Sequence, residues 1–448
     1  MLEPARCETI RAPMPHAKPR LYRDPVHDTI AFAPDTAEGR LMVALLDARE
    51  VQRLRRIRQL ALSSLVYHGA EHSRFSHSIG VAWLARRMLD SISRSVDLAE
   101  DERLVTLAAA LLHDVGHGPF SHALETLGGG HHEERTLALI LDPASEIHAV
   151  LVTASPDFPA RVAARIGGTD ATAPWLREIV SSQLDADRLD YILRDGHMTG
   201  VQIGRYDLER ILAMLDVADD GHLAFHMGGQ AAVEGYLLAR FHMYQQVYLH
   251  KTSRSAERML VAALARASEL SRAGARPEPW PAGPLGELLD GREIPPSRFA
   301  ELDDVDVWAA LKSFAHAGDP VLAHLASGLL HRRLWKARVL PAQDDARADE
   351  LVAAARSIAR VKGFDPEHHI LVDESWDSPY RPYTGVEGSR KAIRLIDREG
   401  RKSFLEDRSS LVQMLGGVRH RQRLLCYHPA LRDPLARLFE SRSEGRSR

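Results

Sequence analysis

The chain has 448 residues, a formal net charge of −3 and only two cysteines, Cys7 and Cys426. This charge balance argues against a general nucleic-acid-binding surface, and no apolar run approaches the roughly 20 residues that span a bilayer. Two distant cysteines do not form a disulfide framework, and the first twenty residues lack the apolar segment of a signal peptide. We therefore expect a cytoplasmic protein without a membrane partner, for which nucleic acid is not an expected partner.

Helical periodicity begins near residue 41, after residues 1–20, which we expect to be a mobile N-terminal arm. Apolar residues spaced by three or four positions predict the first buried helical stripe: Leu41, Leu45, Ala48, Val51, Leu54 and Ile57. The stretch 52–58, which overlaps this stripe, is rich in arginine. Such a charge run is usually a solvated helix face, so a binding role needs further support.

Two helices are expected next, and both carry histidines. His77 lies at the start of an amphipathic pattern that continues through residue 88, and the apolar stretch 104–112 ends at the adjacent residues His113 and Asp114. Neighbouring residues of a helix point roughly 100° apart. His113 and Asp114 can therefore face one point only where the helix ends, and the glycines and proline of residues 116–119 bend the chain there.

The histidine and aspartate side chains predict a metal site. A neutral imidazole and a carboxylate suit Mn, Fe, Ni or Zn and, less well, Mg. The lack of a nearby cysteine argues against a structural zinc site with thiolate ligands. Two ligands do not hold a metal ion, but His77 lies upstream and the acidic run that contains Asp187 lies downstream.

The remaining chain predicts a mainly α fold with a smaller α+β C-terminal lobe. One long helix is expected from about residue 230 to 270, and the Pro- and Gly-rich residues 273–300 are expected to form a linker or surface excursion. The lobe comprises residues 301–438, and residues 439–448 should be a disordered tail. Helical patterns are expected at 303–314, 319–331 and 346–361, and strands at 369–372, 392–396 and 423–427.

Three motifs that contain histidines, aspartates or both, at 71–80, 113–122 and 182–191, resemble those of the HD-domain deoxynucleoside triphosphate (dNTP) triphosphohydrolases. The resemblance covers roughly residues 20–430 and implies that residues 21–272 form the HD domain. It implies four metal ligands, namely His77, His113, Asp114 and Asp187. It also places three histidines and a carboxylate around the scissile phosphate, namely His117, His122, His132 and Glu125.

The resemblance leaves the general acid open between His122 and His132. An imidazole suits that task because its ordinary pKa lies close to the working pH. The family often has Asp where this chain has the longer Glu125. The implied substrate-binding residues are Gln59 and Leu60 at the sugar, Arg74, Arg188 and Arg240 at the phosphates, and Tyr191, Asp195 and Tyr248 around the deoxyribose.

The resemblance therefore implies metal-dependent hydrolysis of a dNTP to the deoxynucleoside and inorganic triphosphate, with Mg accompanying the triphosphate. It further implies a homo-oligomer, a dimer or tetramer. An activating nucleotide would bind at the positions that match an allosteric site, namely Asp47, Gln52 and Arg55. Two alternatives stay open: an HD phosphohydrolase or phosphodiesterase that acts on another nucleotide or on single-stranded nucleic acid, and a non-enzymatic nucleotide sensor.

Overall fold

The computed structural model describes residues 18–120, 124, 130–170, 172–377, 380, 392–418 and 420–440. The part of the expected arm (residues 1–20) up to residue 17 and the part of the expected tail (residues 439–448) from residue 441 lie outside these residues. Of the rest, Arg20 begins a strand, and Phe439 and Glu440 end the last helix. Helices dominate, as predicted, and the described residues also form three small sheets. Among the described helices, none combines the length and the apolar character needed to cross a membrane.

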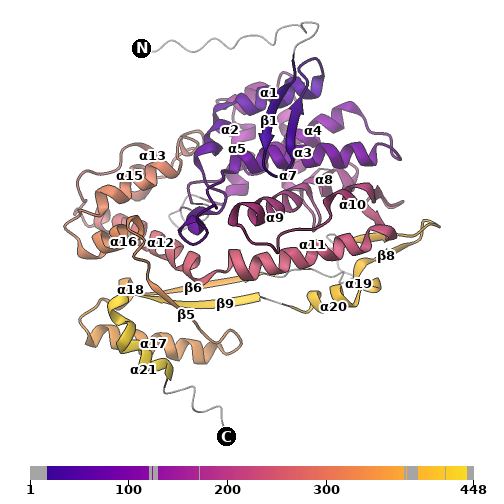
Figure 1. Ribbon diagram of the computed structural model, residues 1–448. Coiled ribbons are helices and arrows are strands. Elements are labelled where there is room, and N and C mark those ends of the chain that lie inside the picture. Colours follow the sequence, from indigo (N-terminus) through magenta and orange to yellow (C-terminus); the bar gives the residue numbers. More distant parts are fainter. Residues whose placement is uncertain are drawn as a thin grey trace, which may run out of the picture.

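A β-hairpin and a set of buried helices form the first part of the molecule (Figure 1). The elements are β1 (Arg20–Asp24), β2 (Asp28–Phe32), α1 (Ala37–Asp47), α2 (Arg49–Arg53), two short 3-10 helices (Leu54–Arg56 and Ala61–Leu65), α3 (Arg74–Ile92) and α4 (Glu100–Leu112). The predicted apolar stripe from Leu41 to Ile57 is buried, because it faces the main core. Helix α4 ends at Leu112, so the predicted helix end before His113 is confirmed.

Six further helices of the described chain surround α3 and α4 and contribute to the main core. They are α5 (His132–Leu141), α6 (Glu146–Leu151), α7 (Phe158–Gly167), α8 (Pro174–Val180), α9 (Ala186–Thr199) and α10 (Leu208–Ala213). Gly116 allows α5 to approach the end of α4, since a Cβ at this residue would lie 2.3 Å from the backbone nitrogen of Thr136. This glycine is therefore needed for a close contact between backbone segments.

The helix expected from residue 230 to 270 is interrupted. Helix α11 (Gln230–Met243) runs into a π-helical turn (Tyr244–Tyr248), and α12 (Lys251–Arg272) begins after His250, whose side chain accepts a hydrogen bond from the Thr252 nitrogen. The break was not predicted, although residues 250–255 (His-Lys-Thr-Ser-Arg-Ser) contain no apolar residue that would continue the helical pattern. The turn brings Tyr244 and Tyr248 to the wall of a cavity described below.

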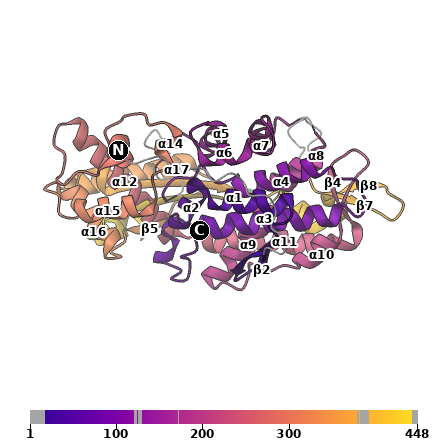
Figure 2. The same cartoon turned by 90° about the horizontal axis from the view of Figure 1, so that it is seen from above.

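A second core forms around α12 at one end of the molecule. Helix α12 packs there with α13 (Gly283–Leu289), α14 (Pro296–Phe299), α15 (Asp304–Phe314) and α16 (Pro320–Leu330). Helices α15 and α16 confirm two of the predicted helical segments. Within residues 273–300, Leu285, Leu289 and Phe299 are buried in this core. Seen from above, α12, α15 and α16 lie at the opposite end from β4, β7 and β8 (Figure 2).

The C-terminal strands belong to two different sheets. The antiparallel sheet β5-β9-β6 (Lys336–Val339, His420–Tyr427 and Ile370–Asp377) extends beneath α11 and α12, and α17 (Asp345–Val361) and α21 (Arg432–Glu440) lie on its other side (Figure 1). The second sheet has the order β3-β4-β7-β8 (Leu215–Val217, Leu223–His226, Arg394–Ile396 and Lys402–Phe404). Short helices α18 (Pro366–His369), α19 (Leu405–Arg408) and α20 (Ser410–Gly416) connect the strands. The predicted strands and the helix at 346–361 are thus confirmed.

Candidate metal centre and nucleotide pocket

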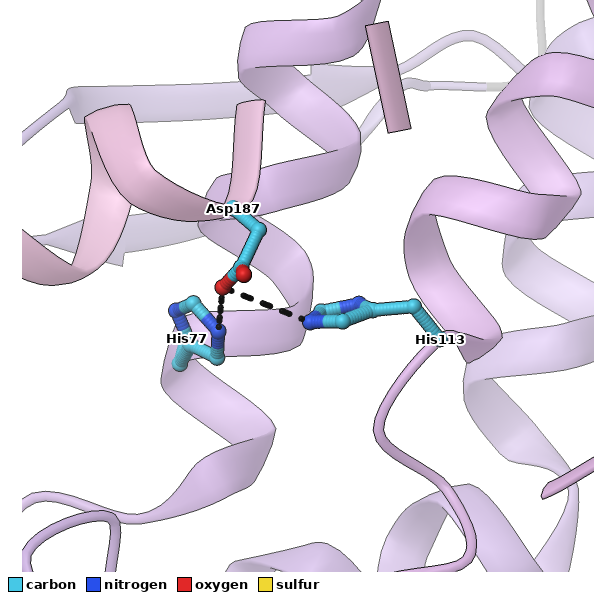
Figure 3. Close-up of side chains that lie close together, drawn as sticks. All are labelled: His77, His113 and Asp187. Atoms are coloured by element: carbon cyan, nitrogen blue, oxygen red, sulfur yellow. Dashed lines mark ion pairs between the residues drawn. The ribbon is translucent and has the colours of Figure 1, made fainter. Parts of the chain in front are cut away.

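Three side chains from three helices meet at one point (Figure 3). His77 lies on α3, His113 follows the last residue of α4, and Asp187 lies in the first turn of α9. Oδ1 of Asp187 is 3.1 Å from Nε2 of His77 and 3.6 Å from Nε2 of His113. The Asp187 carboxylate therefore points between the two imidazoles.

The two imidazoles are oriented so that their Nε2 atoms face the Asp187 carboxylate and are the candidate metal-binding atoms. Nδ1 of His113 lies 2.9 Å from the Ala110 carbonyl oxygen, and Nδ1 of His77 lies 2.8 Å from Oδ2 of Asp190. Because both oxygens accept, each Nδ1 carries a proton, and in the neutral imidazole Nε2 is then the nitrogen that offers a lone pair to a metal ion. Among the described residues, both Nε2 atoms are buried without a hydrogen-bond partner. Such orphaned nitrogens beside a carboxylate fit a divalent cation.

Asp114 joins this group from the side. Its Oδ1 is 3.5 Å from Nε2 of His113 and 3.3 Å from Nε2 of His117, while its Oδ2 accepts a hydrogen bond from Arg74. Burial opposes a charge on Asp114, but the positive charge of Arg74 and a hydrogen bond from His117 outweigh that effect and hold its pKa well below the usual value. Asp114 thus adjoins the group of His77, His113 and Asp187 through its contact with His113, but its ligand atom groups with those of His117 and His132.

Two of the expected phosphate-site histidines lie beside Asp114. The rings of His117 and His132 stack with their centroids 3.9 Å apart. Burial and the nearby charge of Arg74 lower the pKa of His117 to about 3. His117 is therefore neutral near pH 7 and is poorly suited to donate a proton. His122 and Glu125 lie outside the described residues.

A cavity of about 710 Å³ opens from this group. Eleven of the predicted site residues line it, namely Gln59, Leu60, Arg74, Asp114, His117, His132, Asp187, Arg188, Tyr191, Asp195 and Tyr248. Arg188 is held by Asp185 and by the Ser182 carbonyl oxygen at 2.6 Å. A second cavity, of about 660 Å³, reaches His113, Asp114 and Asp187. The cluster is therefore accessible for a small ion and for a larger ligand.

Both carboxylate oxygens of Asp195 contact polar side chains of the protein itself. Oδ1 of Asp195 lies 2.7 Å from Nε2 of His72, and Oδ2 accepts a hydrogen bond of 2.8 Å from the Tyr248 hydroxyl. The rings of Tyr191 and Tyr248 meet edge to face, with centroids 6.0 Å apart. These side chains form a mixed polar and aromatic wall that suits a sugar.

Arg240 and the three residues of the expected allosteric site do not line the larger cavity. Arg240 is buried, with its guanidinium 5.3 Å from the centre of the Tyr244 ring, but it is not among the residues that line the larger cavity. The three residues of the expected allosteric site contact their own neighbours. Asp47 pairs with Arg20, Gln52 donates to the Leu46 carbonyl oxygen, and the Arg55 guanidinium lies 3.6 Å from the centre of the Phe75 ring.

Several residues around the site were not predicted from the sequence. Asp190 hydrogen-bonds His77, His72 holds Asp195, and Arg254, Arg258 and Asp373 line the cavity beyond the tyrosines. Asp190 follows Asp187 by three residues on α9, so helical spacing could have pointed to it. No local pattern linked Asp373 to the cavity, because it belongs to β6 of the C-terminal sheet.

Comparisons with known proteins define the family. The model of the HD domain matches residues 74–192, and that of the HD associated region matches residues 206–276. The uncharacterized protein YwfO of Bacillus subtilis is 36% identical over 411 residues, which is 91% of this chain and 92% of that protein. A phosphohydrolase structure from Bacteroides thetaiotaomicron matches with a TM-score of 0.79 and 31% identity, over 92% of this chain and 100% of the other. The chain belongs to the HD-domain phosphohydrolase family.

Within this family, relatives with a named activity match a smaller region. The deoxynucleoside triphosphate triphosphohydrolase SAMHD1 of Bos taurus is 28% identical over 289 residues, which is 56% of this chain and 48% of that protein. The SAMHD1 homolog of Dictyostelium discoideum is 31% identical over 239 residues, or 50% of this chain and 46% of that protein. The chain thus spans about half the length of these two relatives.

Proposed function

We propose that this protein hydrolyses a dNTP to the deoxynucleoside and inorganic triphosphate in a metal-dependent reaction. The observation that carries the proposal is the composition of the 710 Å³ cavity. It joins two expected metal ligands, Asp114 and Asp187, to the arginines Arg74 and Arg188 and to the wall around Asp195. A nucleotide site needs metal ligands and arginines for the phosphate chain, and polar and aromatic side chains for the sugar. The similarity to the SAMHD1 relatives, which are named deoxynucleoside triphosphate triphosphohydrolases, supports the same reaction.

His77, His113, Asp114 and Asp187 would hold the divalent cation, for which Mn, Fe, Ni and Zn all suit the donor set. Such a cation, when bound, polarises a phosphate oxygen and lowers the pKa of a water molecule. Arg74 and Arg188 offset the negative charge of the phosphates, and Arg240 supplies a third positive charge from behind the tyrosines. Mg accompanies the triphosphate.

In the proposed reaction a water oxygen forms a bond to the α-phosphorus, and the bond from the α-phosphorus to the 5′ oxygen breaks. The triphosphate keeps the new oxygen, and the proton that the attacking water loses passes to solvent. The 5′ oxygen leaves with a proton from a histidine, which regains one from solvent. His132 and His122 are the candidates for this proton donor, because burial and Arg74 keep His117 neutral. Asp195 would accept a hydrogen bond from the 3′ hydroxyl, and Leu60 would occupy the space that a 2′ hydroxyl needs.

The test is a product analysis with Mn-loaded protein and each of the four dNTPs, alone and mixed. The expected products are the deoxynucleoside and inorganic triphosphate, and both should be absent with Asp114→Ala. Turnover only in the mixture would support an activating nucleotide at Asp47, Gln52 and Arg55. Release of orthophosphate or pyrophosphate instead would overturn the proposed reaction and favour another phosphoester substrate.

A further inference from the structure

A buried network joins the N-terminal hairpin to the metal centre. Asp190 lies at its middle and is fully buried. Its Oδ2 is 2.8 Å from Nδ1 of His77 and 2.8 Å from Nε of Arg194, and its Oδ1 is 2.7 Å from Nε2 of His27 and 2.8 Å from Nη2 of Arg194. Four polar contacts thus fix the carboxylate that orients the imidazole of His77.

The hairpin supplies two members of this network from a single turn. Asp24 at the end of β1 accepts hydrogen bonds from the backbone nitrogens of Val26 and His27, both at 2.9 Å. The other oxygen of Asp24 is 2.7 Å from Nη1 of Arg194. Asp24 therefore sets the conformation of the turn that presents His27, and it also holds the arginine that clamps Asp190.

The helices approach each other closely to make these contacts. Gly80 lies one turn after His77 on α3, and a Cβ at Gly80 would lie 2.0 Å from Oδ1 of Asp190 and 2.3 Å from Nη2 of Arg194. The absence of a side chain at this position leaves the space that Asp190 and Arg194 occupy. His27, with 1% of its side chain exposed, closes the network from the hairpin.

We infer that the hairpin positions the metal ligand His77, with His27 and Asp24 acting through Asp190, and so sets the affinity of the centre for its divalent cation. The inference rests on the metal centre of the proposed function, but not on the identity of the substrate. Partners that orient a metal-bound histidine typically change metal affinity by about 10- to 100-fold when removed. His27 and Asp24 are thus positioning residues that lie far from the ligands in sequence.

The test titrates metal-free protein with Mn²⁺ and measures the free ion by its electron paramagnetic resonance signal. We expect His27→Ala to weaken Mn²⁺ binding by about tenfold or more. His27→Gln, whose amide still offers a donor to Asp190, should recover most of the affinity. Asp28→Asn changes an exposed carboxylate in the same turn and should bind Mn²⁺ like the wild type.

Thermal unfolding separates positioning from a merely structural role. Mn²⁺ should raise the Tm of His27→Ala by less than it raises the Tm of the wild type. If His27→Ala does not fold, Asp24→Asn takes its place and should show the same smaller gain. An unchanged Mn²⁺ affinity in a folded variant that only melts earlier would overturn the inference, as would a wild type that binds no Mn²⁺. A wild type that binds Mn²⁺ but hydrolyses no dNTP would refute the proposed function and leave the positioning role intact.

Discussion

Nε2 of His72 lies 2.7 Å from Oδ1 of Asp195, and both side chains are buried. This contact ties the segment before α3 to α9 and fixes the carboxylate that we assign to the 3′ hydroxyl of the substrate. The Tyr248 hydroxyl binds the other oxygen at 2.8 Å. The orientation of Asp195 thus depends on two residues that lie far from it in sequence.

His72→Ala should lower kcat/KM for dNTP hydrolysis by roughly 10-fold or more, because a buried carboxylate would lose one of its two anchors. Steady-state kinetics with each dNTP would measure the effect. His68→Ala, which changes an exposed histidine of the same segment, is the matched control. Equal kcat/KM values for the two variants would contradict the assigned role of Asp195.

Leu60→Ala should weaken the discrimination between deoxyribose and ribose. Leu60 lines the cavity, and removal of its branched side chain would leave space for a 2′ hydroxyl. The ratio of kcat/KM for dNTP over NTP should fall by about tenfold. Leu141→Ala, at an exposed position of α5, should leave that ratio unchanged. A ratio preserved in Leu60→Ala would place the sugar elsewhere.

Gly80→Ala should destabilise the protein by about 1–3 kcal/mol, since the new methyl group would overlap Asp190 and Arg194. Gly235→Ala on α11 is a useful contrast, because a Cβ there meets no atom within 4 Å. That variant should gain about 0.5–1 kcal/mol from the higher helix propensity of alanine. Denaturant unfolding would compare the two. A Gly80→Ala variant as stable as the wild type would argue against the tight α3–α9 packing.

Acid should weaken the contact between α16 and the end of β9. Nε2 of His428 lies 2.8 Å from Nε2 of His324, and burial together with the neighbouring His324 and His369 lowers the pKa of His428 to about 4. The pKa is about 6.5 in the unfolded chain. The folded state therefore prefers neutral His428, so its contribution to stability is full above pH 6.5 and is lost as the pH falls toward 4.

The loss of Tm between pH 7.5 and pH 5.5 should be about 1–2 °C smaller in His428→Gln than in the wild type. Scanning calorimetry at the two values would measure it. His316→Ala, at an exposed position after α15, should retain the wild-type pH response. An identical pH response in His428→Gln would show that this histidine pair does not influence stability.

The sequence predicted those features that depend on local patterns. The end of α4 before His113 follows from an apolar run that meets glycines and a proline, and α15, α16 and α17 follow from their helical periodicity. The motif resemblance placed eleven residues that indeed line one cavity. Their proposed roles await the kinetic tests.

Features that depend on distant pairing could not be predicted in the same way. β3 has three residues, too few for an alternating pattern to emerge. The strand β7 was predicted, but its parallel pairing with β4 across more than 150 residues of chain was not. Likewise, His27 and Asp190 are 163 residues apart. Only the packing of the hairpin against α9 makes them neighbours.

The most direct test of the proposed reaction is hydrolysis of a dNTP in water enriched in oxygen-18 by Mn-loaded protein, followed by mass spectrometry of the products. We predict unlabelled deoxynucleoside and inorganic triphosphate that carries one labelled oxygen, with no product from Asp187→Ala. Label in the deoxynucleoside, or a labelled orthophosphate or pyrophosphate, would contradict attack at the α-phosphorus and the function proposed for this site.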